Sequence, residues 1–155
     1  MKDALELVNE PYEEQCPNTL PPLYESLYKS LQLDYFFVPK QCDEAFISKL
    51  VKQLKPYQQI VVGVYEMNKF SRKNFGITAS TLDFLNQIQS KSPYLCLFGS
   101  PYSLKNFENQ NVILMGYEND RDAQIGCAEI LFGQREAKGK LPISSGKFKE
   151  GLSVN

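Results

Sequence analysis

The chain has 155 residues, the length of one folded domain with little room for a second. Its content of 43% hydrophobic and 23% charged residues is ordinary for a globular protein, and 17 basic against 18 acidic residues give a formal net charge of -1. This balance argues against a nucleic-acid-binding protein, which would carry a basic excess. The sequence contains no histidine, which excludes Ser-His-Asp catalysis, Cys-His catalysis and histidine metal sites within it.

The first residues differ in character from the rest of the chain. They are acidic, and the proline-containing run Cys16–Pro22 that closes them excludes a continuous helix. We therefore interpret residues 1–19 as an acidic, proline-rich extension or linker and residues 20–155 as the folded domain. No stretch resembles a signal peptide, and none is long and apolar enough for a membrane span.

After residue 20, segments with helical spacing alternate with short apolar runs. In chain order, we predict a helix at 23–31, a strand at 35–38, a helix at 43–55, a strand at 60–65, a helix at 78–88, a strand at 94–98, a short helix at 101–107, a strand at 112–116 and a helix at 120–131. Candidate N-caps are Asp43, Asp120 and either Thr78 or Ser80.

Strands and helices in strict alternation, with strands that are apolar on both faces, are typical of βαβ units around a parallel sheet. Right-handed crossovers would place helices on both faces of that sheet. We predict an α/β three-layer sandwich with a doubly wound, mostly parallel sheet of about four to six strands, flavodoxin-like in appearance.

In such a sheet, ligands usually bind at the loops that leave the carboxyl ends of the strands. Three loops, at 66–76, 99–102 and 117–121, should therefore open on one edge of the domain. The first contains Arg72 and Asn74 among other cations, amides and two phenylalanines, a set that suits a carboxylate, a phosphate or sugar hydroxyls. The alternative is a solvated loop whose phenylalanines hold it against the domain.

Two further groups of residues have structural explanations. Asp120 and its acidic neighbours Glu118 and Asp122 suit an acid–base pair or a cation site, but acids in a first helical turn are also stabilised by the helix dipole. Cys96 and Cys127 lie in apolar runs, which predicts buried thiols.

Other cofactor chemistry has little support in the sequence. A bridge between Cys16 and Cys42 stays open, although the four cysteines lack metal-ligand spacing. The glycine-containing segments have neither GxGxxG nor GxxxxGK[ST] spacing, so a nucleotide site has little support. We expect neither a cofactor nor a bound metal.

Several motifs in register are similar to the C-terminal α/β sandwich domain of glycoside hydrolase family 3, in its bacterial β-N-acetylglucosaminidase (β-N-acetylhexosaminidase-like) branch. The closest resemblance is an alanine-containing helix that ends in Leu-Phe-Gly and is followed by Gly-Lys-Leu-Pro. The matching segments are DAQIGCAEILFG at 122–133, GKLPIS at 139–144, VVGV at 61–64, SRKNFG at 71–76, LFGSPYSLK at 97–105 and GYEN at 116–119. Order and spacing hold from about residue 31 to 152.

The resemblance implies a partner, because family members carry a (β/α)8 barrel before this domain, and the catalytic aspartate and the Asp-His pair lie there. The chain would then supply no catalytic residue and would pack on the barrel of the same or a parent protein, in a periplasmic or secreted setting. We expect Arg72, Asn74, Tyr102 and Glu118 to be its substrate contacts, since they offer hydrogen bonds and a stacking ring to a sugar.

This predicts the C-terminal module of a retaining glycoside hydrolase, which helps to wall the sugar site but hydrolyses no glycoside alone, because no pair of carboxyl groups at catalytic spacing is evident. The alternative is a free-standing, flavodoxin-like binding or interaction domain. The two differ in surface: a docked module should expose a sizeable apolar patch, whereas a free-standing domain should be well covered.

Overall fold

A computed structural model describes residues 4–9, 22–28 and 33–153. Its centre is a parallel sheet of five strands in the order β2-β1-β3-β4-β5. The strands are β1 (Ala4–Asn9), β2 (Leu33–Phe37), β3 (Val61–Val64), β4 (Tyr94–Leu97) and β5 (Val112–Met115). This order is that of flavodoxin-like folds, so the predicted fold class is confirmed.

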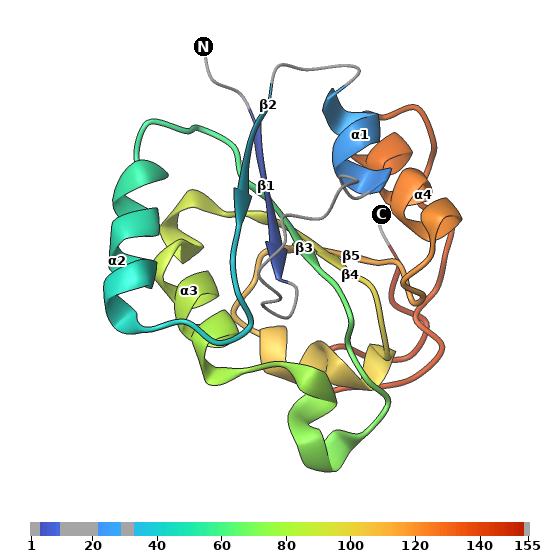
Figure 1. Cartoon of the computed structure of the whole chain (residues 1–155). Helices are drawn as coiled ribbons and strands as arrows, with labels where there is room; N and C mark the ends of the chain where they lie inside the picture. The colour runs from blue at the N-terminus through green and yellow to red at the C-terminus, as the bar shows by residue number, and fades with distance from the viewer. Residues whose placement is uncertain (1–3, 10–21, 29–32, 154–155) are drawn as a thin grey trace.

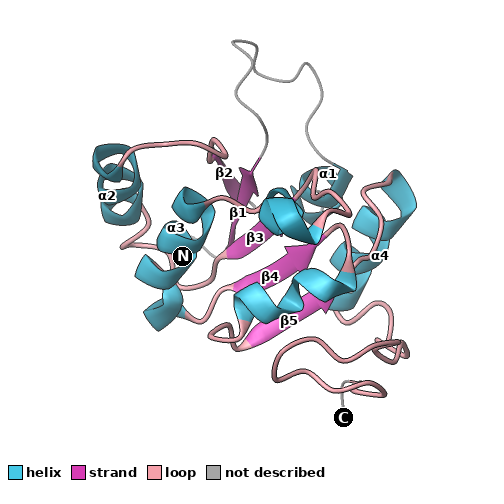
Figure 2. Cartoon of the chain, turned by 90° about the horizontal axis from the view of Figure 1, so that it is seen from below, coloured by secondary structure: helices cyan, strands magenta, loops and turns pink. Residues whose placement is uncertain are grey.

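The helices form two layers (Figures 1 and 2). α2 (Glu44–Gln53) and α3 (Ala79–Gln87) cover one face of the sheet, while α1 (Pro22–Tyr28) and α4 (Arg121–Leu131) pack together on the other. Three 3-10 helices complete the connections: η1 (Ser71–Gly76), η2 (Gln89–Lys91) and η3 (Pro101–Phe107). No helix in the described part of the chain is long and apolar enough to cross a membrane.

The two faces of the sheet bury two separate cores. On β4, Leu95 and Leu97 belong to the core beneath α2 and α3, whereas Cys96 belongs to the core beneath α1 and α4. All three side chains are fully buried. Burying each leucine contributes about 1.5–3 kcal/mol, which explains why the strands are apolar on both faces.

The helix starts follow the predicted caps. The carboxylate of Asp43 accepts a hydrogen bond from the backbone N–H of Phe46 at 2.7 Å, and Asp120 accepts one from Ala123 at the same distance. Thr78, rather than Ser80, caps α3. These bonds satisfy N–H groups that have no partner inside the helix.

The structure differs from the sequence prediction at residues 4–9, which form β1 and not part of a linker. β1 pairs in parallel with β2 on one side and with β3 on the other. The prolines that exclude a helix all come after Asn9, so they do not interrupt the strand. The folded domain therefore includes residues 4–9, and residues 10–19 lie outside the described residues.

Candidate functional site

The three predicted loops lie at one edge of the sheet because β3, β4 and β5 run in parallel. Figure 1 shows η1 and η3 together at this carboxyl edge, at the bottom of the view, with η1 projecting furthest. The loop that contains η1 leaves β3, which neighbours β1 where the strand order reverses. Flavodoxin-like folds bind ligands at this reversal of the strand order.

The η1 loop has a defined and partly strained conformation. Asn74 and Phe75 have φ values of 48° and 57°, in the left-handed region that non-glycine residues seldom adopt. The backbone N–H of Asn68 donates to the Phe75 carbonyl at 2.8 Å, and the Asn74 side-chain amide donates to the Ile77 carbonyl at 3.2 Å. Asn74 therefore shapes the loop with the amide that was predicted to contact substrate. Strain of this kind is frequent at functional sites.

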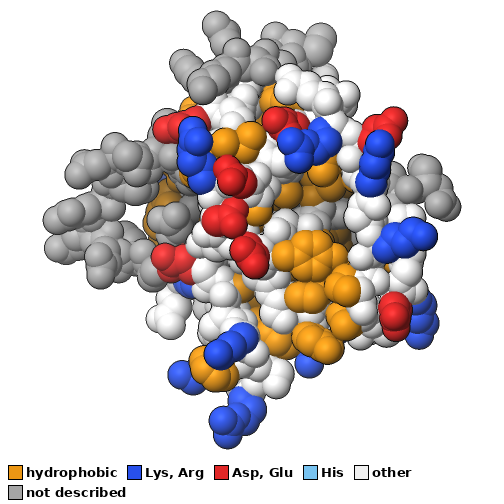
Figure 3. Space-filling view, turned by 90° about the vertical axis from the view of Figure 1, so that its right-hand side faces the viewer, with side chains coloured by type: hydrophobic (Ala, Val, Ile, Leu, Met, Phe, Trp, Pro, Cys, Tyr) orange, Lys and Arg blue, Asp and Glu red, His pale blue; other side chains and the backbone are white. Residues whose placement is uncertain are grey.

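The outer surface of the loop is cationic and aromatic. Phe75 is buried and anchors the loop, but the Phe70 ring is 49% exposed. The ammonium groups of Lys69 and Lys73 lie 5.8 and 6.0 Å from the centre of that ring. Arg72 is also exposed. Figure 3 shows basic side chains gathered at the lower tip of the molecule, where Figure 1 places η1.

A cavity of about 410 Å³ lies between η1, η3 and the C-terminal segment. Tyr102 lines this cavity and is 55% exposed. The Ser145 hydroxyl donates to the Tyr102 carbonyl at 2.9 Å and accepts from the backbone N–H of Lys105 at 3.1 Å, which fastens the C-terminal segment to η3. The cavity residues are Lys69, Ser71, Phe75, Tyr102, Lys105, Ser144, Ser145 and Gly146.

The structure brings only part of the predicted set together. Tyr102 lines the cavity, while Arg72 and Asn74 belong to the adjoining loop without lining it. Sequence reasoning missed Lys105 and Ser145, whose contact with the loops joins segments about forty residues apart. The Gly-Lys-Leu-Pro motif predicted a non-helical segment after α4, but it did not indicate that this segment contacts η3.

Glu118 lies on a different loop, away from the cavity. Its backbone N–H donates to the Gly116 carbonyl at 2.7 Å, a tight turn in which Tyr117 has a φ of 65°. The Tyr117 ring is 38% exposed, and partial burial raises the pKa of its hydroxyl. Asp120 is occupied as the cap of α4 and Asp122 lies in the first turn of that helix, so these two acids have the structural role that sequence analysis considered, whereas a substrate contact of Glu118 stays a prediction.

Neither the cavity between η1 and η3 nor a second cavity beside β5 is lined by two carboxylates. Glu66, the first residue after Tyr65, lies 3.8 Å from Lys40, measured between carboxylate oxygen and ammonium nitrogen. Its carbonyl accepts a hydrogen bond from the same ammonium at 2.9 Å. These contacts hold Glu66 at the base of the η1 loop. Because the Glu66 side chain is about half exposed, the ion pair adds little stability.

The buried cysteines are confirmed. Cys96 is fully buried and Cys127 is 5% exposed. A hydrogen bond from the Cys96 thiol lowers the pKa of Cys127, against the opposing effect of burial. Cys42 is a free, half-buried thiol, and burial raises its pKa. Cys16 lies outside the described residues, and among those described no group of three potential metal ligands occurs.

No protein-family model matches the sequence, and no curated protein matches it. Solved structures do. A fungal multi-domain family 3 β-N-acetylglucosaminidase matches 99% of this chain with a TM-score of 0.69 and 18% identity. The family 3 β-N-acetylglucosaminidase of Paenibacillus sp. str. FPU-7 matches 97% of it with a TM-score of 0.68 and 16% identity, and a family 3 exo-β-xylosidase matches 86% with a TM-score of 0.57 and 13% identity.

The chain spans 16%, 28% and 20% of these three proteins, respectively. It therefore corresponds to one region of much larger glycosidases. At these identities the likeness concerns the fold, and it agrees with the motifs at 61–64, 97–105 and 122–144. The chain has the fold of the C-terminal-type α/β domain of glycoside hydrolase family 3.

Proposed function

We propose that the chain is a non-catalytic module of a β-N-acetylglucosaminidase-like glycosidase, and that its carboxyl edge packs on a (β/α)8 barrel and helps to wall the sugar site. The observation that carries the proposal is a set of exposed aromatic rings at this edge. Phe70, Tyr102 and Tyr117 are 49%, 55% and 38% exposed, and each follows a different strand. Exposed aromatic residues on one edge favour a partner over a free surface.

The chemistry of this edge suits a neutral or anionic sugar. The Tyr102 ring offers a face for stacking against the apolar side of a pyranose ring. Lys69 and Lys105 border the same cavity, and the hydroxyls of Ser144 and Ser145 add hydrogen-bonding groups. The cavity of about 410 Å³ lies within the range of small-ligand sites, and its open side would be closed by the barrel.

A sugar titration tests whether the carboxyl edge of the sheet contacts a sugar. N-acetylglucosamine titrated into the labelled chain is expected to shift the amide signals of η1 and η3 with an affinity in the millimolar range, since only one wall is present. Tyr102→Ala should abolish the shifts. Phe46→Ala on α2 is the matched control, because this ring is 37% exposed on another surface. Shifts that are absent, or that survive Tyr102→Ala, contradict the sugar-facing assignment.

Two separate experiments test whether the chain is catalytic and whether it belongs to a larger protein. The purified chain is expected to release no chromophore from aryl N-acetyl-β-glucosaminide or aryl β-glucoside, and turnover above the buffer rate would contradict a non-catalytic module. An antibody against the chain should detect, in source cells, a polypeptide several times its size. A band at the size of this chain alone would favour the free-standing binding domain instead.

A further inference from the structure

β5 forms an open edge of the sheet, with no strand on its outer side among the residues described. The Gly116 N–H donates to the Leu97 carbonyl at 2.8 Å. Because backbone groups alternate in direction along a parallel strand, those of Leu114 also face β4 and those of Ile113 and Met115 face away. Within the described ranges, the outward backbone groups have no hydrogen-bond partner. Figure 2 shows β5 as the last strand of the row.

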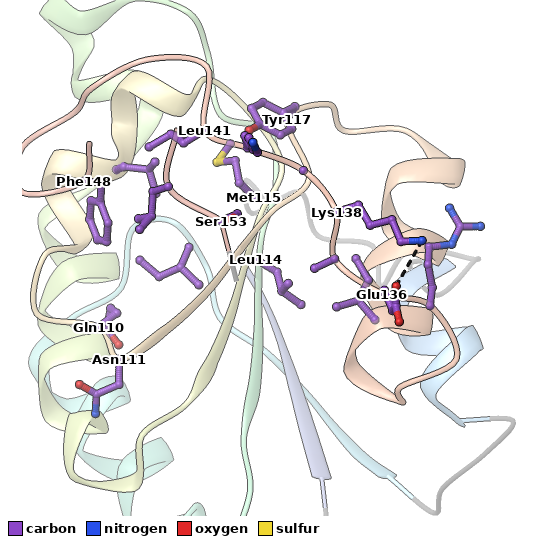
Figure 4. A pocket seen from close by; sticks show the side chains of 18 residues that line it. Gln110, Asn111, Leu114, Met115, Tyr117, Glu136, Lys138, Leu141, Phe148 and Ser153 are labelled. Atoms are coloured by element: carbon purple, nitrogen blue, oxygen red, sulfur yellow. Dashed lines mark ion pairs between the residues drawn. The ribbon is translucent and has the colours of Figure 1, made fainter. Parts of the chain in front are cut away.

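A cavity of about 490 Å³ lies along this edge. Ile113 and Met115 pack against the core beneath α2 and α3, and Leu114 packs against the opposite core, yet all three line the same cavity. The cavity therefore straddles the edge of the strand and not one face of the sheet. Figure 4 shows its two sides, with Leu141 and Phe148 on one and Glu136 and Lys138 on the other.

A buried polar atom also faces this space. Gln110 lines the cavity and is 5% exposed, and its side-chain oxygen has no hydrogen-bond partner in the part of the chain that the structure describes. A buried carbonyl left unpaired costs about 1–3 kcal/mol. The cavity thus combines apolar walls with three positions that require hydrogen bonds: the carboxamide of Gln110 and the backbone of Ile113 and Met115.

We propose that this edge binds an extended peptide segment, which adds a sixth strand beside β5. A peptide backbone supplies alternating N–H and C=O groups at the spacing of Ile113 and Met115, and one of its N–H groups can donate to the unpaired side-chain oxygen of Gln110. Its side chains alternate between the two sides of the strand, which matches a cavity lined by apolar residues from both faces of the sheet, Ile113 and Met115 from one and Leu114 from the other. A compact small molecule would not meet the needs of both backbone positions.

The charge of the rim indicates what the peptide carries. The Nε atom of Arg135 lies 2.7 Å from Oε2 of Glu129, and the Nζ atom of Lys138 lies 3.2 Å from Oε2 of Glu136. Both cations are therefore paired. Lys140 is exposed and has no ion-pair partner among the described residues. An acidic residue beside the apolar ones would pair with it.

Hydrogen exchange at single amides tests the proposal. The probe is a set of capped heptapeptides with a glutamate at each end, valine, leucine or tyrosine at alternate positions, and threonine between them. Bound peptide is expected to slow exchange of the Ile113 and Met115 amides by at least about tenfold, and to leave the η1 amides unchanged. The same peptides with N-methyl groups at alternate backbone nitrogens keep their side chains but should bind about tenfold more weakly.

Two substitutions in the chain complete the test. Gln110→Met keeps the volume and removes the unpaired oxygen, so the free energy of unfolding should not fall while peptide affinity drops about fivefold. Lys140→Glu should weaken binding, and Lys49→Glu on the exposed face of α2 is its control.

Three results would overturn the proposal. They are no protection of Ile113 and Met115 by any peptide, equal binding of the N-methylated set, and protection that rises with protein concentration alone, which would assign the edge to a second copy. All of these are independent of the sugar titration.

Discussion

Replacing Gly63 by alanine perturbs a crowded point of the sheet. A Cβ atom at this position would lie 2.5 Å from two atoms of the Tyr65 side chain, Cε2 and the hydroxyl oxygen. Carbon atoms in good contact are about 3.5–4.0 Å apart, so the ring would have to move by about 1 Å. It has little room to do so, since it is 2% exposed and stacks on the fully buried Phe98 with centroids 5.0 Å apart.

The expected cost follows from this overlap. Overpacking a dense core typically costs about 1–3 kcal/mol. For a domain of this length, that corresponds to a decrease in melting temperature of roughly 2–12 °C. Urea unfolding followed by circular dichroism measures it, with Gly139→Ala as the control, because a Cβ there would meet no heavy atom within 4 Å. The control should change the unfolding free energy by less than about 0.5 kcal/mol.

A double-mutant cycle identifies the ring as the cause. In a Tyr65→Leu background the shorter side chain leaves space for the new methyl group, so Gly63→Ala should cost at least about 1 kcal/mol less than it does alone. If Gly63→Ala is neutral in the otherwise unaltered chain, or if its cost is the same in both backgrounds, the close approach of ring and backbone does not determine stability here.

Two further predictions concern the elements around the carboxyl edge. Asp120→Ala removes the cap of α4 and should lower the unfolding free energy by about 1 kcal/mol, whereas Asp122→Ala, which removes no capping bond, should cost clearly less; equal costs in urea unfolding would contradict this assignment. The raised pKa of Tyr117 means that the folded state retains its proton longer than the unfolded state, so this contribution to stability is complete below about pH 10 and is lost as the pH rises further. Tyr117→Phe should therefore reduce the alkaline decrease in unfolding free energy, and Tyr102→Phe, measured over the same pH range, controls for the loss of one phenol; an unchanged decrease would refute the link.

Local patterns predicted most of the fold. Asp43 and Asp120 cap their helices because a side chain three residues before the donor decides this interaction. β1 was missed because its stability comes from pairing with β2 and β3, which are distant in sequence, and because Glu6 interrupts its apolar run. A strand that pairs with a neighbour on each side can form with a lower β-propensity and a less regular apolar pattern than an isolated strand would need.

For the candidate site, too, the sequence predicted the placement of the loops but not the roles of individual side chains. The rule for parallel strands placed the loops with Arg72 and Tyr102 at one edge, as observed. It could not show that Asn74 uses its amide to shape its own loop, or that Ser145 closes the cavity from the far end of the chain. Side-chain roles within loops depend on a few non-local hydrogen bonds, and these leave no periodic trace in a sequence.

The position of β1 between β2 and β3 also has a consequence for biosynthesis. During synthesis, residues 4–9 emerge before β2 and β3, with which they pair, and β3 is complete only at Val64. Until β3 is complete, β1 cannot form the hydrogen bonds that it makes with both neighbouring strands. Proteolytic removal of residues 4–9 would separate β2 from the strands β3–β5. The N-terminus of this domain is therefore a poor site for fusions that shorten it.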